Sequence, residues 1–154
     1  MQYVIQQMTQ ANALTIANDW KYDGEYAFYD MTADPEDYAE FVDESARWKN
    51  DFYEVLCDGD LCGYFCVERG DSDIEIGLGL RPDLCGHGTG RSFVTQILDF
   101  ASTKYVFDRI VLNVALFNQR AIKVYRACGF VDVEVCDRAT NGGIYPFLCM
   151  QRVK

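Results

Sequence analysis

Seven short segments of the chain have the pattern of strands, with apolar residues at alternate positions or in short unbroken runs. The clearest is the segment at 74–80, where Ile74, Ile76, Leu78 and Leu80 recur at every second position. Because successive side chains of a strand point to opposite faces, these four would share one face of a sheet. Strands are expected at 4–5, 52–56, 61–67, 74–80, 109–115, 130–135 and 144–150.

Four other segments repeat their apolar positions every three or four residues, which is the period of a helix. Thr9 is a candidate N-cap for the first helix, and Pro35 suits the first position of the second. Gly129 is placed to end the fourth. The segment at 21–29, which is rich in aromatic and acidic residues, is expected to be a loop. Helices are expected at 10–20, 35–47, 91–105 and 118–128.

The order of these elements predicts a mixed sheet. Asp58-Gly59-Asp60 and the run at 141–143 are hairpin turn signals, so the strands on either side of each are expected to be antiparallel. The strand, helix and strand between 74 and 115 instead form a long crossover, which implies one parallel pair. A dinucleotide-binding fold would place a glycine loop after its first strand, which is not the order here. The sequence therefore predicts one α/β (α+β) domain over 1–154.

Composition indicates a globular protein, since 49% of the 154 residues are apolar and 14% are aromatic. We expect neither a membrane span nor a secretory signal, because the chain has no apolar run of about 18 residues and begins without a basic region. The seven cysteines are scattered without a CxxC pair, and there is one histidine. We therefore expect reduced thiols, no metal site and a cytoplasmic protein.

The net charge is −10, from 24 acidic and 14 basic residues. Such a surface repels the phosphates of nucleic acid and would steer a cationic substrate toward the protein. The same charge would equally serve solubility alone.

A glycine-rich segment, LRPDLCGHGTG at 80–90, joins the strand at 74–80 to the helix that follows. Gly86, Gly88 and Gly90 allow a tight turn and a close approach to the backbone. The first N–H groups of the following helix have no partner within the helix and carry the positive end of its dipole. The segment therefore predicts a site for a ligand that bears phosphate.

Two motifs in this order resemble the GNAT superfamily of N-acetyltransferases. The first is its acetyl-CoA loop, Arg/Gln-x-x-Gly-x-Gly/Ala, which here reads CGHGTG at 85–90, with Cys85 where Arg or Gln is common. The second is its Asn-x-x-Ala-hydrophobic-x-x-Tyr-x-x-x-Gly-Phe signature, which here reads NQRAIKVYRACGF at 118–130. A lone glycine loop is weak evidence, whereas two motifs in the right order are specific.

The resemblance implies a fold and an activity. The fold would be a mixed, mostly antiparallel sheet of about seven strands, with helices on both faces and a splayed parallel strand pair. The activity would be acetyl transfer from acetyl-CoA, as cosubstrate, to a primary amine that attacks the thioester directly in a ternary complex. Homodimers are common in the family.

The resemblance also implies a set of cofactor-binding residues. The three glycines would hold the CoA pyrophosphate, with Thr89 and Arg91 beside it and His87 facing solvent. The backbone at 78–80 would bond pantetheine and present an N–H to the thioester oxygen, and Gly79 suits a bulge there. Asn118 either contacts the cofactor or caps its helix. The full set is Leu78, Gly79, Leu80, Cys85, Gly86, His87, Gly88, Thr89, Gly90, Arg91, Asn118 and Ala121.

Tyr125 would be the general acid that protonates the departing thiolate, by resemblance to the family, although its position alone would suggest a core residue. Glu75 is a candidate general base on the strand that carries the thioester, with a water relay as the alternative. Its side chain faces either the acceptor or solvent. Asn113 stands where some members of the family carry a glutamate base, which an asparagine cannot replace.

By resemblance to the family, the acceptor site is expected at a cluster between the first two helices, with Tyr145 as a further candidate. The cluster consists of Tyr22, Glu25, Tyr26, Tyr29 and Asp30. Aromatic faces and carboxylates suit a cation, and the same residues could equally form a packed loop.

Two other functions stay open on the sequence alone. One is a CoA-binding sensor or regulatory module without catalysis, and the other is a nucleotide-binding regulator. Tyr125 favours the enzyme, since binding alone does not require the phenol.

Overall fold

The computed structural model describes residues 2–45 and 51–154, which contain one seven-stranded sheet. The sheet has the order β1-β2-β3-β4-β5-β7-β6, so β7 lies inside the sheet although it comes last in the sequence. All neighbours are antiparallel except β4 and β5. The strands are β1 (Tyr3–Gln7), β2 (Asp51–Cys57), β3 (Asp60–Arg69), β4 (Asp73–Leu80), β5 (Arg109–Ala115), β6 (Val131–Thr140) and β7 (Gly143–Val153).

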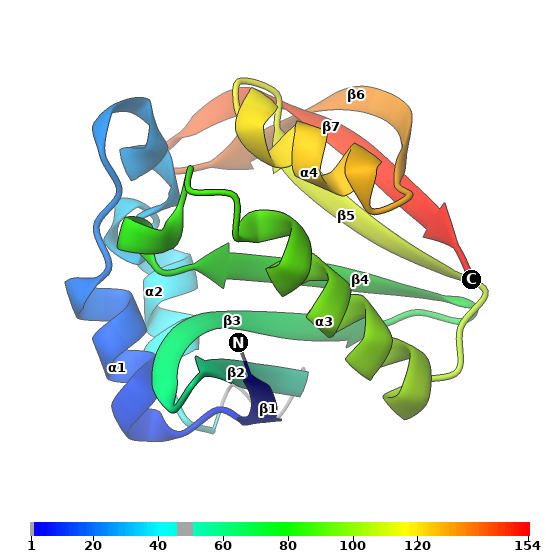
Figure 1. The fold of residues 1–154 in the computed structure, drawn as a ribbon. Coiled ribbons are helices and arrows are strands. Elements are labelled where there is room, and N and C mark those ends of the chain that lie inside the picture. Colours follow the sequence, from blue (N-terminus) through cyan, green and yellow to red (C-terminus); the bar gives the residue numbers. More distant parts are fainter. Residues whose placement is uncertain (1, 46–50) are drawn as a thin grey trace.

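Helices cover both faces of the sheet, as expected (Figure 1). α3 and α4 lie on one face, and α1 and α2 lie on the other. The Thr9 side chain caps α1 by accepting a hydrogen bond from the Asn12 N–H, and the Asp34 side chain caps α2. The helices are α1 (Gln10–Asp19), α2 (Pro35–Val42), α3 (Gly90–Lys104) and α4 (Gln119–Ala127).

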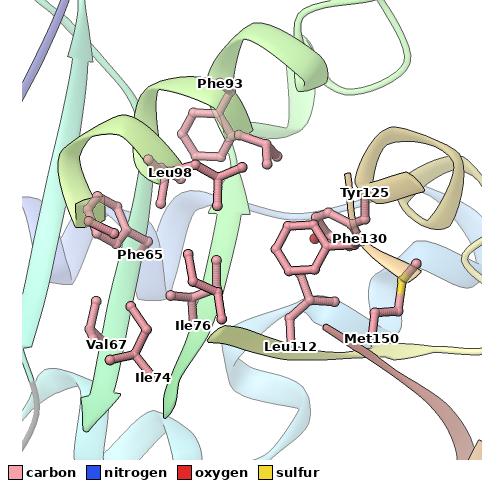
Figure 2. Packing of buried hydrophobic residues seen from close by; sticks show 14 of the residues in the cluster. Phe65, Val67, Ile74, Ile76, Phe93, Leu98, Leu112, Tyr125, Phe130 and Met150 are labelled. Carbon is pink, nitrogen blue, oxygen red and sulfur yellow. The ribbon is translucent and has the colours of Figure 1, made fainter. Parts of the chain in front are cut away.

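The larger hydrophobic core lies between the sheet and the pair α3 and α4 (Figure 2). Phe93 and Leu98 of α3 pack over apolar side chains of β3 and β4, including Phe65 and Ile76. A smaller core lies under α1 and α2 and includes Trp20. The period-two pattern of β4 thus places its apolar residues toward α3, as the sequence predicts.

Glu54 is a fully buried carboxylate that attaches α1 to the sheet. It accepts hydrogen bonds from the side chains of Gln6 and Asn12 at 2.7 and 2.9 Å and from the backbone and side chain of Thr9. Buried charge is tolerated when its oxygens are bonded in this way. The position of α1, and of the segment that follows it, is therefore fixed from β2.

The parallel pair separates soon after it begins. β4 and β5 are eight and seven residues long, but only three pairs are in register, from Asp73 with Arg109 to Glu75 with Val111. Figure 1 shows the two strands meeting at one end and diverging toward the other. The splayed pair that the sequence predicts is confirmed.

The expected loop at 21–29 and the expected end of the second helix differ from the structure. The loop contains the 3-10 helix η1 (Gly24–Tyr29), and η2 (Met31–Ala33) follows it. α2 ends at Val42 rather than near 47, and residues 46–50 lie outside the described part of the chain. The Asp43 side chain accepts hydrogen bonds from the backbone and hydroxyl of Ser45, a local turn that competes with the helix.

The closing hairpin is longer than expected because its turn is tight. Asn141 and Gly142 adopt positive φ angles of 51° and 75°, as a two-residue turn requires, so the ladder continues to Thr140 and Gly143. Asp34 holds this turn by accepting hydrogen bonds from the Asn141 N–H and the Thr140 hydroxyl, and these bonds lower the pKa of Asp34. The amide of Asn141 donates to the Phe28 carbonyl at 2.7 Å. Within the described ranges, no helix has the length and apolar character to cross a membrane.

Candidate active site

A cavity of about 540 Å³ opens where β4 and β5 separate. Ile76 and Leu112 line it from the sheet face that α3 covers, whereas Gly77 and Asn113 line it from the other face. Because consecutive residues of both strands contribute, the cavity passes between the strands from one face of the sheet to the other. A slot of this kind admits a ligand that lies beside β4 in place of the missing strand.

The backbone of β4 faces this slot at every second residue. Hydrogen bonds from Gly70 to Asp73 and from Arg81 to Cys62 show that the odd-numbered residues of β4 pair with β3. The last pair with β5 uses the Ile76 N–H, which donates to the Val111 carbonyl, so beyond it the C=O of Ile76 and the N–H and C=O of Leu78 point into the gap. Gly79 points its backbone toward β3.

Gly79 does not form the expected bulge, because the register of β3 and β4 runs without a shift through this position. Its lack of a side chain serves another purpose. A Cβ at Gly79 would lie 2.4 Å from a ring carbon of Tyr64. The glycine thus makes room for an aromatic ring that lines the cavity.

The glycine loop forms one end of the cavity. Gly86 and Gly88 have φ angles of +76° and +81°, which side chains rarely adopt, and both line the cavity. α3 begins at Gly90, where a Cβ would lie 3.3 Å from a methyl carbon of Val124, so the glycine lets the helix start close to α4. No side chain caps α3, since the Thr89 hydroxyl donates to the Leu84 carbonyl instead. The first N–H groups of a fifteen-residue helix are thus available to an anion.

Three cationic side chains line the cavity on this side: Arg91, Arg120 and Lys123. The guanidinium carbon of Arg120 lies 4.2 Å from the ring centroid of Tyr26, and Arg120 Nη1 lies 3.0 Å from where a Cβ of Gly86 would be. The sequence analysis included Arg91 but missed Arg120 and Lys123. Their spacing of three residues on a helix that starts beside the loop was the available signal.

Tyr125 lies in the cavity wall with its ring edge-on to Phe130, 6.0 Å between centroids (Figure 2). Burial, with a smaller effect of Tyr29 and Tyr64, raises the pKa of its hydroxyl well above the usual value of 10.0. The phenol therefore keeps its proton at neutral pH. Within 2–45 and 51–154, the structure gives this hydroxyl no hydrogen-bond partner, so its proton is free for a ligand.

The Cys85 thiol is directed at backbone carbonyls of Leu80 and Arg81, each 3.6 Å away. Burial raises the pKa of this thiol. Since the thiolate is the nucleophilic form, Cys85 is poorly suited to attack a thioester.

Asn118 has the capping role that the sequence left open, because its Oδ1 accepts from the Ala121 N–H at 3.2 Å. Its Nδ2 donates to the Tyr29 hydroxyl at 3.2 Å, and the Ala115 N–H donates to the same oxygen at 3.3 Å. Asn118, Ala121 and Tyr29 line the cavity. Tyr29 belongs to the aromatic and acidic cluster at which the sequence predicts the acceptor site.

Tyr22 and Tyr26 also line the cavity. The Tyr22 hydroxyl donates to the Leu80 carbonyl at 2.8 Å, and burial raises the pKa of this hydroxyl above its usual value of 10.0. Tyr22 thus holds the end of β4 in place. Tyr145 lies outside the lining, with its ring centroid 5.0 Å from that of Phe28.

Glu75 is exposed on the last residue pair of β4 and β5 and accepts a hydrogen bond from Asn113 Nδ2 at 3.2 Å. Among the described residues that line the cavity, none has a carboxylate. A base would therefore have to act from the rim or through water. The predicted site residues outside the lining are Glu25, Glu75, His87, Thr89 and Tyr145.

Solved structures share this fold at low sequence identity. A chimera of the spermidine N-acetyltransferase SpeG from Vibrio cholerae and hSSAT is 18% identical, with a TM-score of 0.72 over 99% of this chain and 96% of that one. The aminoglycoside acetyltransferase AAC(6')-Ib, solved in complex with coenzyme A, is 17% identical, with a TM-score of 0.78 over 99% of this chain and 95% of that one. At these identities the likeness shows the fold alone.

A curated relative, the spermidine N(1)-acetyltransferase of Vibrio cholerae serotype O1, is 33% identical over 58 residues. That stretch is 38% of this chain and 34% of the relative, so the match spans about a third of the relative's length. The sequence model of the acetyltransferase (GNAT) domain matches residues 3–131, which include the glycine loop and the whole second motif. The chain therefore belongs to the GNAT acetyltransferase family.

Proposed function

We propose that the protein transfers the acetyl group of acetyl-CoA to a primary amine. The observation that carries the proposal is the slot between β4 and β5, which joins an anion-binding helix start to the Tyr125 hydroxyl. A diphosphate fits the positive-φ glycines and the three cations, and a pantetheine arm fits the free edge of β4. In this placement the thioester reaches the part of the slot that Tyr125 lines.

The reaction would run in one ternary complex. The amine nitrogen attacks the thioester carbon, the carbonyl oxygen becomes an oxyanion, and the C–S bond then breaks to give the amide and the CoA thiolate. The backbone N–H of Leu78 stands on the gap side of β4, beyond the last pair with β5, where it can bond that oxyanion. A route through an acetylated Cys85 is disfavoured, because its thiol is held on carbonyls and has a raised pKa.

Proton transfers at the leaving thiolate and at the amine complete the proposal. The Tyr125 phenol donates its proton to the leaving thiolate and is then restored from solvent. The amine must lose a proton before it attacks and another afterwards, since an aliphatic ammonium has a pKa of about 10. We assign Glu75 as the final acceptor of these protons, through water, because it bonds a residue of the cavity wall and the described residues of that wall include no carboxylate.

A cationic acceptor is the preferred class. The net charge of −10 would draw cations toward the protein, and Tyr26 and Tyr29 offer aromatic faces in the cavity. Relatives of this fold act on spermidine and aminoglycosides by their names, which is consistent with this class. The seven free thiols suit a reducing compartment and support a cytoplasmic location. A homodimer stays a prediction from the family.

One observation favours a second function, a CoA-binding module without catalysis. It is the lack of a carboxylate among the described residues of the cavity wall. An acceptor screen with acetyl-CoA separates the two, with thiol release and product mass as readouts. Acetylated amine supports the transferase, whereas tight acetyl-CoA binding without product for any amine would support the module.

A further inference from the structure

Tyr64 is a half-buried tyrosine of the cavity wall that has no role in the reaction described above. It lies on β3, and its side chain belongs to the smaller core, under α1 and α2. Its ring centroid lies 6.2 Å from that of Trp20 and 5.4 Å from that of Phe41. Tyr125 belongs to the core on the other face of the sheet. Two phenols thus approach the slot from opposite faces.

The ring of Tyr64 reaches from β3 across to β4. Tyr64 and Gly79 stand directly opposite each other on the two strands. The ring carbon Cζ and the hydroxyl oxygen lie 2.8 and 3.0 Å from where a Cβ of Gly79 would be. Because neighbouring strands are about 4.8 Å apart, the hydroxyl end of the ring lies over β4 rather than over its own strand. Gly79 follows Leu78, whose N–H points into the gap, so the hydroxyl lies beside a backbone donor.

The Tyr64 hydroxyl is open to the cavity and carries a proton that it can donate. Among residues 2–45 and 51–154, the structure gives it no hydrogen-bond partner. In the same ranges, Asn113 Oδ1 is the one enclosed side-chain nitrogen or oxygen without a partner, so the Tyr64 hydroxyl is not enclosed. Burial raises the pKa of Tyr64 above its usual value of 10.0. The phenol therefore stays protonated at neutral pH and can donate to a ligand.

We propose that the Tyr64 hydroxyl donates a hydrogen bond to the thioester oxygen and, together with the Leu78 N–H, forms the oxyanion hole of the transfer. The inference rests on the proposed function and adds a catalytic residue to it. When the amine attacks, negative charge moves onto this oxygen, so two donors placed beside it stabilise the transition state more than the substrate. Tyr64 keeps its proton throughout. The C–S bond breaks as the carbonyl re-forms, and the sulfur takes its proton from Tyr125.

The ring of Tyr64 is held in place before any ligand binds. Trp20 and Phe41 pack against it on one face of the sheet, and Gly79 leaves room for it on β4. A donor that is already in position needs no reorganisation when the charge develops. The glycine at 79 is therefore part of the same arrangement, because a side chain there would push the hydroxyl away from the gap.

The first test observes the thioester carbonyl itself. Acetyl-CoA labelled with a heavy isotope at the carbonyl carbon is bound to the protein without an amine, and the infrared difference spectrum isolates the C=O stretch of the bound thioester. A hydrogen bond to the oxygen weakens the C=O bond and lowers the stretching frequency. In Tyr64→Phe, which keeps the ring, we expect the band to move to higher frequency. Acetyl-CoA affinity, measured by calorimetry, should stay unchanged.

The second test measures turnover with acetyl-CoA and spermidine, benzylamine or tyramine. Removing one donor from an oxyanion hole costs about 10²–10³-fold in rate, so the kcat of Tyr64→Phe should fall by about that factor. KM for the amine should stay the same. The pH profile of kcat/KM should also stay the same, because Tyr64 neither gives up nor takes up a proton.

Tyr38→Phe is the matched control. Tyr38 packs against the same smaller core as Tyr64, but its hydroxyl donates to Asn18 outside the cavity wall. This substitution should change neither the C=O frequency nor kcat. Tyr125→Phe gives a second comparison, because it should lower kcat and leave the band in place.

Each result decides the role of Tyr64. An unmoved band in Tyr64→Phe overturns the proposal, and a raised KM for the amine would then place the hydroxyl on the acceptor instead. A shifted band with an unchanged kcat overturns the catalytic role. If the band shifts but the wild type acetylates none of the amines, the proposed function fails and the contact between Tyr64 and the thioester stands. If the wild type does not bind acetyl-CoA, both fail.

Discussion

The two ends of the cavity are built in different ways. The cofactor end consists of the glycine loop at 85–90 and the starts of α3 and α4, which lie within about forty residues of one another. Its main groups are backbone N–H groups and three cations. The acceptor end joins the segment at 22–29 to β4, β5 and the start of α4 through side-chain bonds, such as Tyr22 to Leu80 and Asn118 to Tyr29.

This difference separates cofactor binding, which many related sequences can share, from the choice of amine, which is particular to one protein. Backbone groups at a helix start recognise any phosphate of the right shape, and a short motif is enough to encode them. Side chains from distant segments can change one at a time, so the acceptor end can vary while the cofactor end stays the same. Substitutions at the first end should therefore alter acetyl-CoA binding, and those at the second should alter the chemistry and the choice of amine.

Gly88→Glu is expected to have the largest effect. It combines a φ of +81°, which a side chain resists, with a carboxylate in the anion site. Acetyl-CoA affinity measured by calorimetry should fall by about 10⁴-fold or more. Gly59→Glu is the matched control, because Gly59 has a φ of +89° and open space around it but lies in the β2–β3 hairpin. Normal binding by Gly88→Glu would refute the anion site.

Tyr125→Phe tests the point where the two ends meet. It removes the proton donor and keeps the ring against Phe130, so kcat should fall about 10²–10⁴-fold with acetyl-CoA affinity unchanged. Because burial raises the pKa of the phenol above 10.0, ionisation of Tyr125 should not reduce the wild-type kcat at any pH below 10. Tyr3→Phe, which removes a hydroxyl bonded to Ser92 outside the cavity, serves as control. An unchanged kcat in Tyr125→Phe would remove the assignment.

Arg120→Ala sharpens the comparison, because Arg120 touches both ends. Losing a charge-assisted contact to phosphate should weaken acetyl-CoA binding about tenfold. Because salt screens this contact, the difference in acetyl-CoA affinity between variant and wild type should shrink as salt is added. Arg126→Ala is the control on the same helix, since Arg126 is paired with Asp132 outside the cavity. Equal affinities for the wild type and Arg120→Ala at low salt would exclude Arg120 from the phosphate site.

Tyr22→Phe should have the smallest effect. It deletes one hydrogen bond to the Leu80 carbonyl, worth about 1 kcal/mol, so KM for acetyl-CoA should rise a few-fold and kcat should barely change. Tyr38→Phe deletes a bond of the same length, 2.8 Å to Asn18, on the far side of α1 and is the matched control. A change in kcat as large as that of Tyr125→Phe would mean that Tyr22 takes part in the chemistry.

The sequence predicts features encoded by neighbouring residues better than contacts between distant segments. The glycine loop and the Asn118 cap depend on residues close together in the sequence, whereas the splayed pair followed from the resemblance to a family, and the structure contains all three. The expected bulge at Gly79 was wrong because the reason for that glycine is the ring of Tyr64, on the neighbouring strand. Arg120 was missed because its contact with the Tyr26 ring is fixed only by tertiary packing.

The place of β7 in the sheet has a consequence for how the protein is made. As it emerges from the ribosome, the chain can form β1 to β4, the glycine loop and α3 early, but β5 has no antiparallel neighbour until β7 arrives. The hairpin that meets Asp34 and Phe28 arrives at the same time. A nascent chain stalled before β7 would thus have a phosphate-binding loop but half a sheet, and completion of the enzyme waits for translation of its last strand.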